Sequence, residues 1–394
     1  MKEKLKAPEL RFSGFTDDWE EYKLGDLLKY EQPTKYIVKS TAYDDDFETP
    51  VLTAGQSFVL GYTNETDGIK YASSEAPVII FDDFTTGSHY VDFPFKVKSS
   101  AMKLLRLKTD NEDFSFIYNT LKNINYVPKS HERHWISKFS EFKVSVPTID
   151  EQVKIGTFFK NLDALITIHQ RKLDLLKEQK KGYLQKMFPK NGEKVPELRF
   201  AGFADDWEEH KVSEITDFHK QGFYTKESYN ENKKYYLLRG TDMTSNKLIL
   251  KDTPKINASE KDYEDFKVLK DDFLIVRSGT VGTYAIVKSD ITAIFGSYLI
   301  NFRFNQSIVL NEFFGLFYQS SLFKSQLNKI IQKSSNVNIN AENIKSTNIK
   351  FPTIEEQQKI GAFFQSIDDT IALHQRKLDL LKEQKKGFLQ QMFI

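Results

Sequence analysis

The sequence has no cysteine, which excludes disulfide bonds and any zinc site built on thiolates. It has no run of about 18 apolar residues either, so we expect no membrane-spanning helix. The opening stretch MKEKLKAPELRF is basic, but no apolar segment follows it. We therefore expect no signal peptide and a soluble, cytoplasmic protein.

The chain also lacks an excess of one charge, because 56 basic residues balance 55 acidic ones and leave a net charge of +1. Any phosphate-binding surface must then be a local cluster of basic groups. Two nucleotide-binding signatures are missing as well, the GxxxxGK[ST] loop and a glycine-rich cofactor fingerprint after a strand. These absences argue against an ATP-binding or cofactor-dependent enzyme.

What the sequence does contain is an internal repeat. The stretch HQRKLDLLKEQKKG occurs at 169–182 and, letter for letter, at 374–387. PELRFSGFTDDWEEYKL (8–24) returns as PELRFAGFADDWEEHKV (196–212), and VPTIDEQVKIGTFF (146–159) returns as FPTIEEQQKIGAFF (351–364). We call 8–24 and 196–212 the leading segments. Each is followed by a dissimilar body and then by a repeated arm.

The pattern predicts an α+β fold with two mixed α/β bodies and two helical arms. Short β-rich runs bounded by Gly, Pro or Asp fill both bodies, and VIIFDDFTTG in the first matches FLIVRSGTVG in the second. One fold with two different surfaces is the simplest interpretation. The expected domains are a first body at 1–145, a first arm at 146–188, a second body at 189–350 and a second arm at 351–394.

The arms carry apolar residues at alternating spacings of four and three, which is typical of a coiled coil. The first seam is expected at Ile155, Phe159, Leu162, Ile166, His169, Leu173, Leu176, Lys180, Tyr183 and Met187. The second is expected at Ile360, Phe364, Ile367, Ile371, His374, Leu378, Leu381, Lys385, Phe388 and Met392. About 39 residues at roughly 1.5 Å each give a rod on the order of 58 Å long.

Each chain has two matching seams, so we expect the arms to pair antiparallel within one chain, with internal pseudo-twofold symmetry. The alternative is a coiled coil that joins two chains. His169, His374, Lys180 and Lys385 fall on the seam, where polar residues commonly set register. The alternative for the histidines is a solvated helix flank.

The repeated motifs resemble those of the specificity (S) subunits of type I restriction-modification systems. The resemblance rests on the leading segments with Lys23–Leu24 or Lys211–Val212, the VPTIDEQ and FPTIEEQ helix starts, and the KLDLLKEQKKG endings. It covers the entire chain in the family's order. It implies two target recognition domains, each reading half of a bipartite DNA site, and the dissimilar bodies then imply unrelated half-sites.

The resemblance also implies partners. These are double-stranded DNA, two methyltransferase subunits docked on the helical arms, and restriction subunits that join them. No cofactor is expected in this chain, because S-adenosylmethionine, ATP and magnesium would be bound by the partner subunits. A structural adaptor that bridges two proteins without reading DNA is the alternative function.

A search for catalytic groups supports a non-catalytic subunit. RSGTVGTY (277–284) lies between predicted strands and is best interpreted as a turn. HERH (131–134) has His-x-x-His spacing but no evident third metal ligand. Two triplets, Glu141–Lys143 and Asp265–Lys267, resemble the end of a nuclease motif, but such triplets arise by chance in a chain with 28% charged residues.

Two stretches ahead of the arms are the main candidates for DNA contact, YVPKSHERHWISKF (126–139) and IIQKSSNVNIN (330–340). Arg and Lys suit guanine edges and phosphates, whereas Asn and Ser suit adenine edges and backbone oxygens. The candidates are Lys129, His131, Arg133, His134, Lys138, Lys333, Ser334, Ser335, Asn336 and Asn338. The alternative is that both stretches are ordinary polar surface loops.

Weaker DNA candidates follow predicted strands at matched positions, where loops would share one surface. They are Thr85, Thr86, Ser88, Arg239, Thr241, Ser278, Thr280 and Thr283. Polar positions of the arms are candidates for partner docking. These are Gln170, Arg171, Lys177 and Gln179, with their repeats Gln375, Arg376, Lys382 and Gln384.

Overall fold

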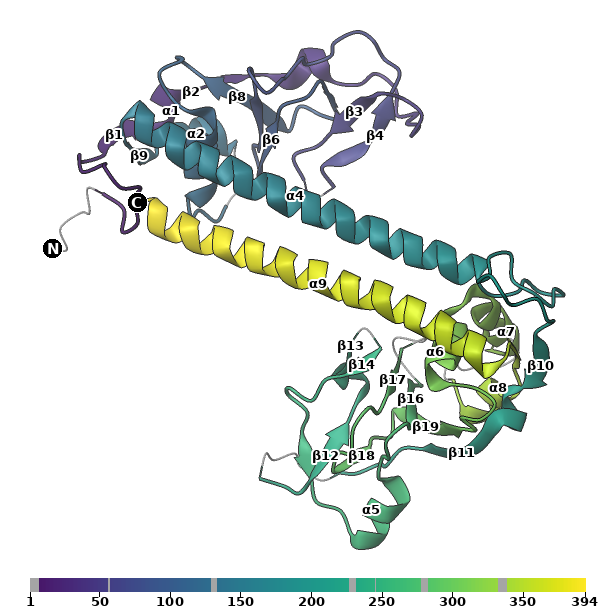
Figure 1. Ribbon diagram of the computed structural model, residues 1–394. Helices are drawn as coiled ribbons and strands as arrows, with labels where there is room; N and C mark the ends of the chain where they lie inside the picture. The colour runs from purple at the N-terminus through teal and green to yellow at the C-terminus, as the bar shows by residue number, and fades with distance from the viewer. Residues whose placement is uncertain are drawn as a thin grey trace. The chain divides into compact units, whose positions relative to one another are not determined.

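The computed structural model describes residues 7–55, 57–128, 133–226, 232–244, 246–277, 283–331 and 339–394. The chain folds into two compact units, Met1–Arg171 with His374–Ile394, and Lys172–Leu373. The two longest helices, α4 (Ile149–Lys186) and α9 (Ile354–Met392), each contribute to both units (Figure 1). Within the described ranges, no helix is long and apolar enough to cross a membrane.

The first unit is built on three small sheets. Its strands are β1 (Glu20–Lys23), β2 (Leu28–Glu31), β3 (Thr49–Leu52), β4 (Val59–Thr63), β5 (Val78–Asp82), β6 (Ser88–Val91), β7 (Lys96–Val97), β8 (Met102–Leu107) and β9 (Lys143–Val146). Its short helices are α1 (Leu24–Leu27), η1 (Pro33–Tyr36), α2 (Phe114–Asn123), α3 (His134–Ser137) and η2 (Phe139–Glu141). The sheet orders are β2-β8-β5-β6, β4-β3-β7 and β1-β9. All neighbouring strands are antiparallel except β3 and β7, which are parallel.

The second unit repeats this topology and adds to it. Its strands are β10 (Glu208–Lys211), β11 (Thr216–Gln221), β12 (Tyr235–Leu238), β13 (Met243–Thr244), β14 (Lys247–Leu248), β15 (Lys255–Ile256), β16 (Phe273–Val276), β17 (Tyr284–Ile286), β18 (Ala293–Phe295), β19 (Leu299–Phe304) and β20 (Asn348–Phe351). Its short helices are η3 (Val212–Ile215), η4 (Gly240–Asp242), α5 (Glu260–Phe266), α6 (Asn311–Gln319), α7 (Ser321–Ile331) and α8 (Ala341–Lys345). The sheets β11-β19-β16-β17, β15-β12-β18 and β10-β20 match those of the first unit strand for strand. The β13-β14 hairpin is an addition.

The match confirms that the two bodies share one fold. VIIF lies in β5 and FLIV in β16, and each strand occupies the third position of its four-stranded sheet. Alternate residues of β5 face two different cores. Ile79 and Phe81 pack in the core that contains α2 and the start of α4, while Val78 and Ile80 pack against the three-stranded sheet. A strand buried on both faces reads as a continuous apolar run, which explains this sequence.

The arms form the helices that the sequence predicts. Asp150 and Glu151 lie in the first turn of α4, and every predicted seam residue is buried or half-buried. In the first unit Phe158 contacts Phe388 and His169 contacts His374, so the two helices run antiparallel there. In the second unit Tyr183 of α4 contacts Phe363 of α9. The seams therefore pair within the chain, as expected from the repeat.

The end of each long helix packs against a leading segment in the same way. In the second unit α4 continues directly into its leading segment, and the N–H of Leu198 donates to the carbonyl oxygen of Lys186 at 2.9 Å. In the first unit the N–H of Leu10 donates to the carbonyl oxygen of Gln391 near the end of α9, at 3.0 Å. In the first unit this contact therefore joins segments near opposite ends of the sequence. In the second unit the same contact joins α4 to the segment that follows it in the chain.

Candidate nucleic-acid interface

The two leading segments are anchored by a buried ion pair to the start of a long helix. Arg11 forms two hydrogen bonds with Glu151, Nε to Oε1 at 2.8 Å and Nη2 to Oε2 at 2.6 Å. Arg199 does the same with Glu356, at 2.8 and 2.7 Å. Both carboxylates are buried, and a fork-shaped guanidinium matches a carboxylate geometrically. Neither pair was predicted from the sequence, although all four residues lie in repeated motifs.

The glutamine after each buried glutamate ties the helix start to the body. The Oε1 of Gln152 accepts from the N–H of Asp113 at 3.1 Å, and its Nε2 donates to the carbonyl oxygen of Pro147. Gln357 does the same with Leu310 and Pro352. The repeated Glu-Gln pair therefore fixes both the leading segment and the loop before α2 or α6. This shared frame positions each recognition body on its helix.

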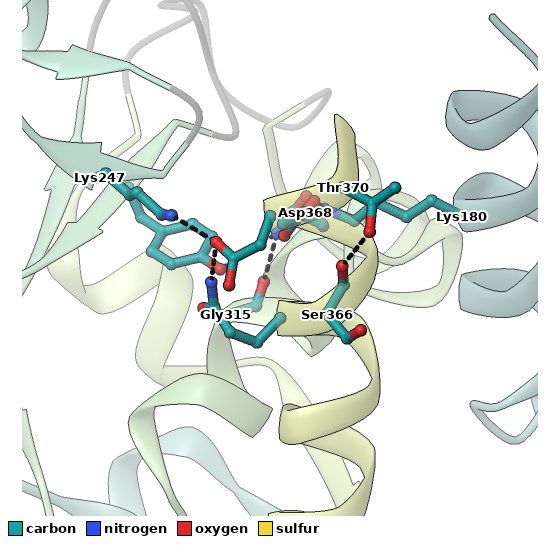
Figure 2. Close-up of polar contacts among 10 residues, drawn as sticks. Lys180, Lys247, Gly315, Ser366, Asp368 and Thr370 are labelled. Atoms are coloured by element: carbon teal, nitrogen blue, oxygen red, sulfur yellow. Dashed lines mark hydrogen bonds and ion pairs between the residues drawn. The ribbon is translucent and has the colours of Figure 1, made fainter. Parts of the chain in front are cut away.

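Seam lysines and histidines pair across α4 and α9. Lys385 contacts Asp163 in the first unit at 2.7 Å, and Lys180 contacts Asp368 in the second at 2.6 Å (Figure 2). The Nδ1 atoms of His169 and His374 lie 3.0 Å apart, so one neutral ring can donate to the other. These contacts confirm that the polar positions belong to the seam.

In the stretch 126–139, Lys129 and His131 lie outside the described residues. Arg133 and Lys138 are exposed, but His134 is fully buried, its N–H donating to the carbonyl oxygen of Asp83 at 2.9 Å and its ring contacting Tyr126. A buried imidazole cannot reach DNA without local opening. The prediction that His134 contacts DNA is contradicted by this burial, and its ring instead packs beside Tyr126 in the core of the first unit.

The corresponding stretch of the second unit falls mostly outside the structure's described ranges. Lys333, Ser334, Ser335, Asn336 and Asn338 all lie within residues 332–338. The residue that follows, Ile339, is buried, and its N–H donates to the carbonyl oxygen of Arg277 at 3.1 Å. This anchor places the end of the stretch beside the residue that follows β16.

Three of the strand-end candidates meet in one groove of the second unit. Arg239, Thr241 and Thr283 line a groove of about 750 Å³, while Ser278 and Thr280 lie outside the described residues. In the first unit Thr85 is exposed and Thr86 is half-buried, in the turn between β5 and β6. Thr86 has a φ of +64°, and its N–H donates to the carbonyl oxygen of Asp82. Ser88 follows in β6 and is half-buried.

The charged residues of the two nuclease-like triplets form ion pairs with neighbouring residues. Glu141 pairs with Lys23, and Lys143 pairs with Glu21, so both link the leading segment to β9 and its approach. In the second triplet Asp265 pairs with Lys220 and Lys267 with Glu264. Nowhere in the described part of the chain do three or more His, Cys, Asp or Glu side chains gather as a metal site would need.

The predicted docking residues of the arms lie on the outer faces of the helices. Arg171, Lys177, Gln179, Arg376, Lys382 and Gln384 are exposed, and Gln170 and Gln375 are half-buried. Four exposed aliphatic side chains at repeated positions were not predicted from the sequence. These are Ile168 and Leu175 of α4 and Leu373 and Leu380 of α9, each between 51% and 60% exposed. Single exposed aliphatic residues are common on protein surfaces, so it is their recurrence at equivalent positions of both arms that sets them apart.

A family model described as the type I restriction modification DNA specificity domain matches residues 16–178 and again 204–383. The chain therefore belongs to this family and carries the domain twice. This agrees with the repeated frame and with the resemblance of its motifs.

Relatives with known names are specificity subunits. The chain is 52% identical over 135 residues to the type I restriction enzyme EcoR124I/EcoR124II specificity subunit of Escherichia coli, an alignment that spans 33% of each protein. It is 21% identical over 393 residues to the type I restriction enzyme MjaVIII specificity subunit of Methanocaldococcus jannaschii, which covers 95% of the chain and 91% of that protein.

Solved structures share the fold. The S subunit of a type I restriction-modification system from M. genitalium superposes with a TM-score of 0.68 at 13% identity, covering 98% of this chain and 99% of that one. A chain from a study of complex assembly and conformational transition in the type I R-M system gives a TM-score of 0.51 at 15% identity, covering 94% and 96%. Both likenesses concern architecture alone.

Proposed function

We propose that this chain is the DNA-recognition subunit of a type I restriction-modification complex. Each recognition domain reads one half of an asymmetric bipartite site. The observation that carries the proposal is the double match to the specificity domain, in which a repeated frame holds two bodies whose strand ends differ. Different surfaces on one fold are what two unrelated half-sites require.

The long helices serve as spacer and docking site in this proposal. Continuous helices of 38 and 39 residues are about 57–59 Å long at 1.5 Å per residue. Their exposed aliphatic side chains recur at equivalent positions, which suits two copies of one partner. Those partners are two methyltransferase subunits, with restriction subunits joining them.

No step of the chemistry is assigned to this chain. The partner subunits bind S-adenosylmethionine for methyl transfer and ATP with magnesium for restriction. The charged triplets that resemble a nuclease motif are occupied in ion pairs, which supports a targeting role. Because the net charge is +1, phosphate attraction has to come from local basic groups such as Arg133 and Lys138.

Co-expression with a type I methyltransferase subunit tests the proposal. Modified bases in the host DNA are then sequenced. A discrete two-part methylated motif is the expected result, and an assembled, active complex that modifies no such motif would overturn the proposal. In the alternative function, a structural adaptor, both bodies bind proteins and the chain directs no modification at all.

A further inference from the structure

A groove in the second unit lies where the strands of two sheets end. It is lined by residues after β11, β12 and β18 and by residues at the facing ends of β16 and β17. Strands β12 and β18 are parallel, so both end at this edge. Strands β16 and β17 are antiparallel, and the end of β16 and the start of β17 also lie at this edge. Five side chains from four segments, Tyr224, Arg239, Thr241, Thr283 and Tyr298, thus converge on one surface.

The floor of the groove is closely packed backbone. A Cβ added to Gly222 would lie 2.0 Å from the carbonyl oxygen of Gly296, and one added to Gly296 would lie 2.9 Å from that of Leu238. Only glycine permits this approach at Gly222. Gly296 also begins a turn, since the N–H of Leu299 donates back to its carbonyl oxygen at 2.8 Å. Tyr298 therefore lies in a turn whose first residue, Gly296, packs closely against the backbone of Gly222.

Arg239 is held in place from one side. Its Nε and Nη2 bond the carboxylate of Asp242 at 3.3 and 3.0 Å, and Nη2 also donates to the carbonyl oxygen of Asp252 at 3.1 Å. Asp242 is buried, whereas the Arg239 side chain is 38% exposed. Within the described residues, the Nη1 atom of Arg239 donates no hydrogen bond. A guanidinium fixed by a carboxylate loses little rotamer freedom when its remaining N–H groups meet an acceptor.

Two tyrosines complete the groove, and each is 68% exposed. A tyrosine combines a large apolar ring with a hydroxyl group, and it loses few rotamers on binding, which makes it common in recognition surfaces. Thr241 and Thr283 add hydroxyl and methyl groups. In the major groove of DNA, bases present N7 and O6 acceptors and the thymine methyl group, which match these donors and apolar faces.

We propose that Arg239 and Tyr298 are specificity-determining residues for the half-site read by the second recognition domain. In this arrangement Arg239 donates through Nη1 to an acceptor on a base edge, and Tyr298 packs against a neighbouring base or its methyl group. The inference rests on the proposed function and adds the residues that read one half-site. The matched edge of the first unit carries Thr53 and Ala54 after β3 instead, so the contacts cannot be shared by both half-sites.

The experiment co-expresses each variant with the methyltransferase subunit and sequences the modified bases. Tyr298→Ala removes an exposed side chain, so folding is preserved, and Arg239→Lys keeps a cation beside Asp242 while removing Nη1. Each variant is expected to reduce discrimination at one position of one half-site by roughly tenfold or more and to leave the other half-site unchanged. Lys261→Ala, an exposed basic residue of α5 outside the groove, is the matched control and should leave the motif intact.

The outcomes separate the two proposals. If the wild-type complex modifies no bipartite motif, the proposed function fails. If the wild type gives a bipartite motif and both variants give the same one at the same discrimination, the groove inference fails alone. Uniform loss of modification across all sequences, without change of the motif, overturns the specificity role as well, since contact with phosphate rather than bases produces that result.

Discussion

The two units share the buried contacts that anchor their leading segments, and they differ in the residues that follow their strands. The Arg11–Glu151 and Arg199–Glu356 pairs have nearly the same geometry, and so do the glutamine contacts beside them. At the groove edge, by contrast, Arg239 of the second unit corresponds to Thr53 of the first. A frame kept by buried charge lets the outer edges diverge, because substitutions there leave the Arg–Glu pairs and the glutamine contacts intact. Four predictions test how far this likeness extends.

The largest expected effect comes from removing the buried carboxylates. Glu151→Ala removes the carboxylate that pairs with the Arg11 guanidinium, in a site where the arginine side chain is only 12% exposed, and Glu356→Ala does the same to Arg199. We expect a loss of about 3–5 kcal/mol in the free energy of unfolding for each, measured by urea denaturation.

The two units differ in the hydrogen bonding of the tryptophan in each leading segment. The Nε1 of Trp19 donates to Glu151 at 3.3 Å, whereas within the described ranges the buried Nε1 of Trp207 has no acceptor. Glu151→Ala should therefore cost more than Glu356→Ala, and equal losses would contradict a contribution from Trp19. The paired change Arg11→Met with Glu151→Leu is the control and should recover much of the loss.

The second prediction concerns how the stability of the protein depends on pH. Glu31 ends β2 and is bonded by Lys35, Lys70 and Tyr36. Burial alone would raise its pKa, but these hydrogen bonds lower it to about 2 from 4.5. A folded-state pKa below the unfolded value stabilises the protein above pH 4.5, and this stabilisation is lost as the pH falls toward 2.

The shift corresponds to roughly 3 kcal/mol at most. The advantage of wild type over Glu31→Gln in unfolding free energy should thus shrink between pH 6 and pH 2.5. The equivalent strand β11 ends in the neutral Gln221, so Gln221→Ala provides a control with no such pH dependence. A pH-independent difference for Glu31→Gln would show that the carboxylate is not held ionised by its partners.

The third prediction addresses the histidine pair. Replacing His169 and His374 together by leucine fills a half-buried seam with apolar groups. We expect the unfolding free energy to rise by about 1 kcal/mol, at the cost of a polar contact that specifies register. The change is measured as an increase in Tm, with the single His169→Leu variant as the control that removes only one of the two rings. A lower Tm for the double variant than for the single one would contradict the prediction.

The smallest effect is expected at a contact that has no counterpart in the first unit. Lys247 of the added hairpin pairs with Asp369 of α9 at 3.0 Å, but the two side chains are 52% and 59% exposed (Figure 2). Lys247→Ala should cost less than about 1 kcal/mol. Lys180→Ala, which breaks a seam pair in which the lysine is 13% exposed, should cost more in the same denaturation experiment. The reverse order would mean that the hairpin contact organises the second unit.

Much of the fold could be predicted because it follows from periodicity and repetition. Every residue that the heptad register assigned to the seams is buried or half-buried, and the paired apolar runs identified β5 and β16. The Arg11–Glu151 pair was missed because a lone arginine and glutamate, 140 residues apart, look like surface charges. Their recurrence as Arg199 and Glu356 within repeated motifs was the signal that could have revealed them.

The candidate interface was harder to predict. His134 was chosen for its polar character, but burial depends on the tertiary contact with Asp83, which no local pattern encodes. Tyr224 and Tyr298 were missed for the opposite reason. Aromatic residues near strands are ordinarily core, and only the structure places these two at the surface.

The bond from Leu10 to Gln391 repeats the bond from Leu198 to Lys186. In the second unit the two joined segments are neighbours in the sequence, whereas in the first unit they lie near opposite ends of it. The covalent link through residues 189–195 is therefore not what makes a leading segment pack on the end of a long helix, because the first unit makes the same contact through hydrogen bonding and packing alone.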